Sequence, residues 1–97
     1  MQAKVRAQKR WIRAFSTLYQ ALPEDAHVPC PNCGADELRV VFVGEAGKYG
    51  GYGFFWCNRC LHGIGLDRVH VPEGVEAVAP DHTDDEINAR VPNFTIV

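Results

Sequence analysis

Two short stretches, CPNCG at Cys30–Gly34 and CNRC at Cys57–Cys60, contain all four cysteines of this 97-residue chain. Each holds a Cys-x-x-Cys pair, and 23 residues separate the pairs. A Cys-x-x-Cys pair in a tight turn directs two sulfurs at one point, so two such turns can form a tetrahedral all-sulfur site. Gly34 follows the first pair, where such a turn needs positive φ. The pattern therefore predicts a structural metal site with four ligands, namely Cys30, Cys33, Cys57 and Cys60.

Disulfides and a redox dithiol fit the sequence less well than a metal site, and the identity of the metal is not fixed by the ligands. Two disulfides would suit a secreted chain, but the basic N-terminus lacks the apolar segment of a signal peptide. A redox dithiol normally lies between a strand and a helix, whereas residues 23–29 contain two prolines and no apolar run. Iron in rubredoxin-type sites uses the same four thiolates, so the residues alone do not separate the two metals. We expect one Zn²⁺ per chain, because an all-sulfur site without an open position suits this ion.

The composition is that of a small cytoplasmic domain. The chain is 46% hydrophobic with a net charge of −2, and no apolar run approaches the length of a transmembrane helix. We therefore expect no membrane contact and a cytoplasmic location, where thiols stay reduced and available to a metal. A core built from so short a chain is marginal, so a metal that cross-links two turns would add stability.

Charge divides the chain into two parts. Residues 1–22 contain five basic residues and no acidic one, whereas residues 23–97 contain five basic residues and all 12 acidic ones. The first part, from about Ala3 to Leu22, has the periodicity of an amphipathic helix, which Pro23 should end. Its apolar arc consists of Val5, Trp11, Ile12, Phe15, Leu18, Tyr19 and Leu22. Its basic face consists of Arg6, Lys9, Arg10 and Arg13.

The middle of the chain predicts three short strands. Leu38–Val43 is strongly β-prone, and Phe54–Trp56 leads into the second cysteine turn. Residues 44–53 contain five glycines and should form the hairpin loop between these strands. The third strand, Ile64–Val71, changes the phase of its apolar positions, which predicts a bulge at residues 67–68.

The order of a CPxCG turn, a strand, a hairpin loop, an aromatic strand, a CxxC turn and a further strand resembles the zinc ribbon superfamily over residues 28–72. The resemblance implies a three-stranded antiparallel sheet with Zn²⁺ at one end. The ligands that it carries over are Cys30, Cys33, Cys57 and Cys60. The chain departs from the pattern at Leu61, directly after the second pair, and its glycine comes only at Gly63. Zinc ribbons occur in transcription factors, polymerase subunits, ribosomal proteins and many bacterial proteins, so the fold implies binding rather than one activity.

We expect a small α+β fold in which the N-terminal helix packs on a three-stranded antiparallel zinc ribbon, followed by an acidic C-terminal segment. The helix, residues 1–22, should place its apolar arc near Phe54 and Trp56, because a lone helix of this length is only marginally stable in water. Residues 28–72 then form the ribbon and residues 73–97 the acidic segment, all within one structural domain.

The acidic segment offers two further elements. It contains six acidic residues against the single basic residue Arg90. Thr83–Glu86 has the form of a capping box, which predicts a short helix to about Arg90. The apolar end, Asn93–Val97, fits an edge strand, a partner-binding tail or a disordered terminus.

The four histidines offer no catalytic pattern. His62 follows Cys60 by two residues and is either a contact of a thiolate or an exposed turn residue. His27 is a weaker case near the first turn, His70 falls in the third strand and His82 lies among acids. None has a nucleophile or carboxylate at a spacing typical of catalysis. We expect no catalytic residue, no organic cofactor and no enzyme activity.

Three functions fit the sequence. The first is a protein-interaction module in which the glycine loop around Tyr49 and Tyr52, or the acidic segment, contacts an unidentified partner protein. The second is a nucleic-acid binder with these tyrosines on bases and the basic face on phosphates, although the ribbon itself is poor in Lys and Arg. The third is a rubredoxin-like redox protein with iron in the four-cysteine site. We favour the first; the phosphate contacts of the second would be Arg6, Lys9, Arg10 and Arg13.

Overall fold

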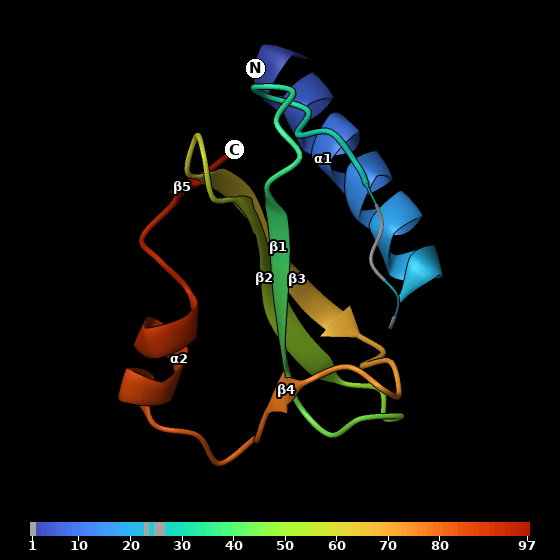
Figure 1. Cartoon of the computed structure of the whole chain (residues 1–97), viewed down its shortest axis with the longest axis vertical. Coiled ribbons are helices and arrows are strands. Elements are labelled where there is room, and N and C mark those ends of the chain that lie inside the picture. Colours follow the sequence, from blue (N-terminus) through green and yellow to red (C-terminus); the bar gives the residue numbers. More distant parts are fainter. Residues whose placement is uncertain (1, 23, 25–26) are drawn as a thin grey trace.

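The chain folds into one mixed sheet with a helix on each side (Figure 1). The computed structural model describes residues 2–22, 24 and 27–97, and for residues 2–5 the backbone alone. The elements are α1 (Gln2–Ala21), β1 (Leu38–Val43), β2 (Gly51–Cys57), β3 (His62–Val69), β4 (Ala77–Val78), α2 (Asp84–Arg90) and β5 (Thr95–Ile96). The strand order in the sheet is β4-β1-β2-β3-β5.

The central three strands confirm the antiparallel part of the expected fold. β1 has the predicted bounds and pairs with β2 from Leu38 opposite Cys57 to Val43 opposite Tyr52. β2 begins at Gly51, so the hairpin loop comprises only residues 44–50, and the last part of the predicted loop belongs to the strand. β3 begins and ends two residues earlier than predicted.

Two additional strands correct the prediction of a purely antiparallel, three-stranded sheet. β4 pairs in parallel with the end of β1, and β5 pairs in parallel with the start of β3, with His62 opposite Thr95. Each of these strands has two residues, which is too short for a periodic sequence signal. Residues 73–97 therefore cover part of both sheet edges, and the apolar end Asn93–Val97 takes the edge-strand role rather than that of a disordered terminus.

The predicted irregularity of β3 is present. Gly51 pairs with Val69 and Gly53 with Leu66, so the register shifts between them, and Arg68 has a φ of 52°. This bulge changes which side chains face the core, and it leaves Val71 fully buried. The prediction of a bulge at residues 67–68 is confirmed.

The contact between α1 and the sheet lies on the other face of β2 from the one predicted. Trp11 packs edge-to-face on Phe55 with ring centroids 5.6 Å apart. Phe54 and Trp56 point to the opposite face, where Phe94 lies parallel to Trp56 at 6.0 Å. Adjacent side chains of a strand point to opposite faces, so an error of one residue exchanges the two faces. Both faces of β2 are thus covered by aromatic contacts.

The helix itself largely follows its predicted pattern. Trp11 and Leu18 are buried, and the four residues of the basic face are all exposed. Ile12 is an exception, because its side chain is 58% exposed. It follows Trp11 by about 100° around the helix, which turns it away from the sheet. The predictions for the side chains of Lys4 and Val5, and for Pro23, lie outside the described part of the chain.

The predicted N-cap at Thr83 and the short helix of the acidic segment are confirmed. Thr83 is the N-cap of α2, and its side chain accepts a hydrogen bond from the Glu86 amide. The Thr83 oxygen thereby satisfies an amide that has no partner within the helix. α2 lies on the side of the sheet opposite α1 (Figure 1).

Candidate metal centre

The two cysteine turns lie together at the end of the sheet next to the N-terminal part of α1 (Figure 1). The first turn precedes β1, and the second connects β2 to β3. In each turn the amide of the residue after the pair donates to the carbonyl of the first cysteine. The two hydrogen bonds, Gly34 to Cys30 and Leu61 to Cys57, both measure 2.9 Å. The two turns therefore share the same local fold.

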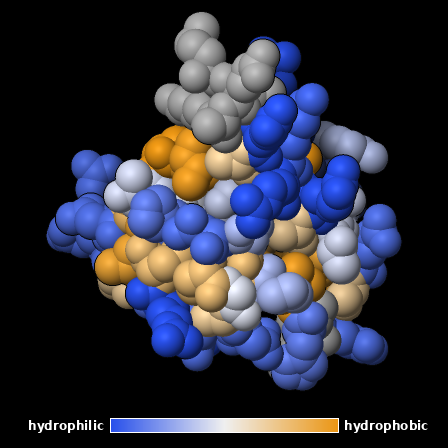
Figure 2. All heavy atoms as spheres, turned by 90° about the horizontal axis from the view of Figure 1, so that it is seen from above, coloured by the Kyte–Doolittle hydropathy of each residue, from blue (hydrophilic) through white to orange (hydrophobic). Residues whose placement is uncertain are grey.

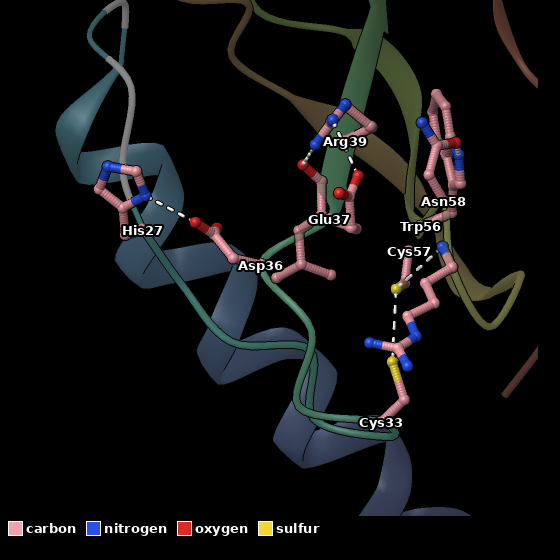
Figure 3. Close-up of polar contacts among 10 residues, drawn as sticks. His27, Cys33, Asp36, Glu37, Arg39, Trp56, Cys57 and Asn58 are labelled. Atoms are coloured by element: carbon pink, nitrogen blue, oxygen red, sulfur yellow. Dashed lines mark hydrogen bonds and ion pairs between the residues drawn. The ribbon is translucent and has the colours of Figure 1, made fainter.

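The four sulfur atoms converge on one point. All four lie within 4.8 Å of one another, and the closest approaches between the pairs are 3.7 Å from Cys30 to Cys60 and 3.6 Å from Cys33 to Cys57. Figure 3 shows the second of these contacts. Four sulfurs placed tetrahedrally at about 2.3 Å from a zinc ion would be about 3.8 Å apart. The cluster therefore has the dimensions of a four-thiolate metal site, and the same donor set suits iron.

Backbone amides point at two of the sulfurs. The amides of Asn32 and Cys33 donate to the Cys30 sulfur at 3.3 and 3.4 Å, and the amide of Arg59 donates to the Cys57 sulfur at 3.4 Å. Such bonds favour the ionised thiolate that a metal requires. The backbone of the turns fixes the direction of these amides, so these hydrogen bonds to the sulfurs do not depend on flexible side chains.

The site joins the hydrophobic core on one side and reaches the surface on the other. Cys30 and Cys57 are buried and belong to the core cluster around Trp11 and Phe55. Cys33 is exposed and Cys60 is half-buried. Seen from this end of the molecule, hydrophilic residues form most of the rim and hydrophobic residues lie toward the middle (Figure 2). A metal bound here would cross-link core and surface.

The sulfurs differ in acidity. Burial raises the pKa of the Cys30 thiol to about 12 and also raises the pKa of the Cys57 thiol. Burial acts in the same direction on Cys60, but hydrogen bonds from the Asn32 side chain and from the His62 backbone and side chain lower its pKa to about 6. Within this fold the surroundings of Cys60 therefore favour the thiolate, whereas those of Cys30 favour the protonated thiol.

Asn32 and His62 form the surroundings of Cys60. The His62 Nδ1 atom lies 3.0 Å from the Cys60 carbonyl oxygen and 3.4 Å from the Asn32 Nδ2 atom. His62 thus contacts the site, as one of its two sequence interpretations proposed. Asn32 was not singled out from the sequence, although its position inside a Cys-x-x-Cys turn is a signal that its amide can reach a sulfur.

The other histidines lie away from the sulfurs. The His27 Nδ1 atom is 2.6 Å from a carboxylate oxygen of Asp36 (Figure 3). His70 follows β3 and contacts Tyr19, and His82 lies 3.2 Å from the Tyr52 hydroxyl. The structure therefore separates these three residues from the cysteine cluster.

Leu61 explains the departure from the zinc-ribbon pattern. Its φ is 55°, so it adopts the left-handed conformation that Gly34, with a φ of 79°, adopts in the first turn. A leucine is strained there, because its Cβ crowds the backbone. Gly63 has a different reason to be glycine, since a Cβ at this position would lie 2.2 Å from the Phe55 carbonyl oxygen.

The helix is tied to the first turn by its basic face. The Arg10 side chain donates a hydrogen bond to the Pro31 carbonyl, between the two ligands of that turn.

Among the described residues, no helix is both long enough and apolar enough to cross a membrane.

Searches of protein-family models, of curated proteins and of solved structures found no match to this chain. The function must therefore be inferred from the geometry of the site and surface.

Proposed function

We propose that this chain is a structural-zinc protein of the zinc-ribbon type that acts as a protein-interaction module in the cytoplasm. The observation that carries the proposal is the four-sulfur cluster, with all sulfurs within 4.8 Å and two of the cysteines buried in the core. Cys30, Cys33, Cys57 and Cys60 would hold one Zn²⁺ per chain. The ion would supply a cross-link between the two turns, and it would have no open position for a substrate.

The arrangement of the ligands supports a structural rather than a catalytic role. The Cys57 ligand ends the same strand that carries Phe55 in the core, so the metal would hold the end of β2 in place. Four thiolates complete the coordination of zinc, and the amides that point at them belong to the turns themselves. We propose accordingly that the chain has no enzyme activity of its own.

The surface supports an interaction role. Several large hydrophobic side chains are exposed, among them Tyr49 at 84% and Ile12 at 58%. Large apolar side chains that stay exposed can serve as contacts for another protein where they lie near one another. A site built from four cysteine thiolates suits a reducing compartment, in keeping with the proposed cytoplasmic location.

Capture of partners from native cells, with and without nuclease, tests this function. We expect proteins that bind the zinc-loaded chain to remain bound after nuclease treatment and to be absent from a Cys57→Ser control. Loss of all captured proteins on nuclease treatment would contradict the protein-interaction function and favour nucleic-acid binding. Elemental analysis of the purified chain tests the metal separately, and iron with visible absorption would favour the redox function.

Nucleic-acid binding is a second candidate, because one specific observation favours it. The basic face of α1 is entirely exposed, and Arg10 holds it beside the first cysteine turn. A row of cations next to a zinc site is a surface that phosphates can contact. The acidic residues 73–97 and the net charge of −2 oppose this candidate.

A further inference from the structure

A groove of about 390 Å³ runs between α1 and the end of β3. Its walls are mostly apolar. Ile12, Phe15 and Tyr19 line it from the helix, and Val69 and His70 line it from the sheet side. Apolar hollows of this kind are where side chains of a binding partner can be buried.

The groove is held in a defined shape. The Tyr19 hydroxyl donates to the His70 carbonyl oxygen at 2.6 Å, and the same hydroxyl oxygen lies 3.2 Å from the His70 Nδ1 atom. The Tyr49 ring lies against the His70 ring with centroids 4.5 Å apart. These contacts join the helix, the end of β3 and the glycine loop, so a partner would meet a largely preformed surface.

One of the most exposed hydrophobic side chains lines this groove, and a second lies next to one of its lining residues. Ile12 is 58% exposed on the helix side, and Tyr49 is 84% exposed and extends the surface beyond His70. Burial of these side chains by a partner would be favourable, because it would remove their apolar surface from water. His70 links the two side chains, because it lines the groove together with Ile12 and its ring lies against the ring of Tyr49.

The outer rim of the groove is cationic. Lys9 and Arg13 are exposed and lie four residues apart, which places them in one row on the solvent side of the groove residues Ile12 and Ser16. α1 contains no acidic residue to neutralise this row. If a binding partner places apolar side chains in the groove, the neighbouring side chains of that partner would lie close to Lys9 and Arg13.

We propose that this groove binds an acidic amphipathic segment of a partner protein, with apolar side chains between Ile12 and Tyr49 and carboxylates facing Lys9 and Arg13. The proposal rests on the protein-interaction function above and names the surface and the chemistry of the partner. Opposite charges at the rim would steer and orient the segment, and the apolar groove would hold it.

Selection from a displayed library of random peptides on the zinc-loaded full chain tests the proposal. We expect enriched peptides in which acidic residues alternate with large apolar ones. Their affinity, measured by fluorescence anisotropy, should fall at least about tenfold in Ile12→Glu. Ile96→Glu is a matched control, because Ile96 is 59% exposed but lies on β5 beside the start of β3, whereas the groove lies at the end of β3, and it should bind like the wild type.

A charge test uses the same peptides. The double variant Lys9→Glu and Arg13→Glu should weaken binding at least about tenfold and flatten its salt dependence. Arg6→Glu serves as the control, since Arg6 is exposed on the same helix but lies about 9 Å along the axis from Ile12. Its effect should be smaller than threefold, roughly the size expected for a peripheral charge.

The outcomes separate the groove from the function as a whole. Enriched peptides that bind equally well to Ile12→Glu and to the wild type would overturn the groove but preserve the protein-interaction function. Enrichment of basic peptides would overturn the charge assignment, and self-association lost in Ile12→Glu would assign the groove to a second copy instead. Failure to enrich any peptide, together with nuclease-sensitive capture from cells, would overturn both.

Discussion

Trp11 of α1 meets Phe55 of β2 edge-to-face, with ring centroids 5.6 Å apart and an interplanar angle of 80°. Both side chains are almost fully buried, at 1% and 0% exposure. Phe55 lies two residues before Cys57, and both residues belong to the same core cluster. The packing of the N-terminal helix and the position of a metal ligand are therefore physically connected through one short strand.

Removal of the Trp11 side chain should test this connection. Trp11→Ala should lower the free energy of unfolding by about 3–5 kcal/mol, because it leaves a large cavity next to Phe55. It should also weaken zinc binding, since folding and metal binding are linked. Denaturant titration and competition with a chromophoric chelator measure the two effects. Ile12→Ala is the control and should change stability by less than about 0.5 kcal/mol.

Metal content should follow the four cysteines and not the histidine. The purified wild type should contain one zinc per chain and be colourless, and Cys30→Ser or Cys57→Ser should unfold at least the β1–β3 region. His62→Ala should keep its zinc, because His62 contacts Cys60 and Asn32 rather than completing the sulfur cluster. Elemental analysis and thermal unfolding give the answer. A cooperative transition retained in both cysteine variants would show that the metal is dispensable.

Leu61→Gly should stabilise the protein by about 0.5–1 kcal/mol, because glycine adopts a φ of 55° without the strain of a Cβ. Gly34→Ala is the reciprocal change in the first turn. No atom lies within 4 Å of a Cβ added there, so its expected cost of about 1 kcal/mol arises from the backbone conformation alone. Thermal unfolding of the zinc-loaded proteins measures both changes, and a destabilised Leu61→Gly variant would contradict the account of the second turn.

Cys60 should react before Cys30 when a chelator has just withdrawn the metal and the β1–β3 region has not yet unfolded. The thiolate is the reactive form, and the pKa of Cys60 is lowered to about 6 whereas that of Cys30 is raised to about 12. At pH 7 iodoacetamide should therefore modify Cys60 well before Cys30, and the rate of reaction at Cys60 should decline as the pH falls below about 6. Asn32→Ala should slow the reaction. Peptide mass spectrometry measures it, and equal labelling of both cysteines would show that the metal-free site does not keep this geometry.

Neutralisation of the basic face separates the two binding functions. The triple variant Arg6→Gln, Arg10→Gln and Arg13→Gln should remain folded, because all three side chains are exposed and the change removes only the exposed hydrogen bond from Arg10 to the Pro31 carbonyl. We expect the wild type to show no measurable affinity for single- or double-stranded nucleic acid near physiological salt. Micromolar, salt-sensitive binding by the wild type that disappears in the triple variant would support the nucleic-acid function instead. Electrophoretic mobility shift and fluorescence anisotropy provide the measurement.

Local patterns in the sequence were sufficient for the elements that depend on neighbouring residues. The two Cys-x-x-Cys pairs predicted the sulfur cluster, because the turn geometry is a property of four consecutive residues. The Thr83 cap and the bounds of β1 followed for the same reason, as did the bulge near Arg68. The local geometry of each cysteine turn and of the cap depends on residues close along the chain, although the two turns themselves meet through Cys30–Cys60 and Cys33–Cys57 contacts between distant segments.

Contacts between distant segments decided the rest. The face of β2 on which α1 packs depends on the whole sheet. The sequence predicted a contact with Phe54 and Trp56, but the contact is with Phe55, because adjacent residues of a strand point to opposite faces. The strands β4 and β5 are too short, at two residues each, to have a sequence pattern, and their partner strands lie more than 30 residues away in sequence. The exposure of Ile12, and with it the groove beside Tyr19 and His70, follows from where the helix meets the sheet. The sequence by itself therefore determined the cluster of metal ligands, whereas tertiary packing decided which surfaces remain open to a partner.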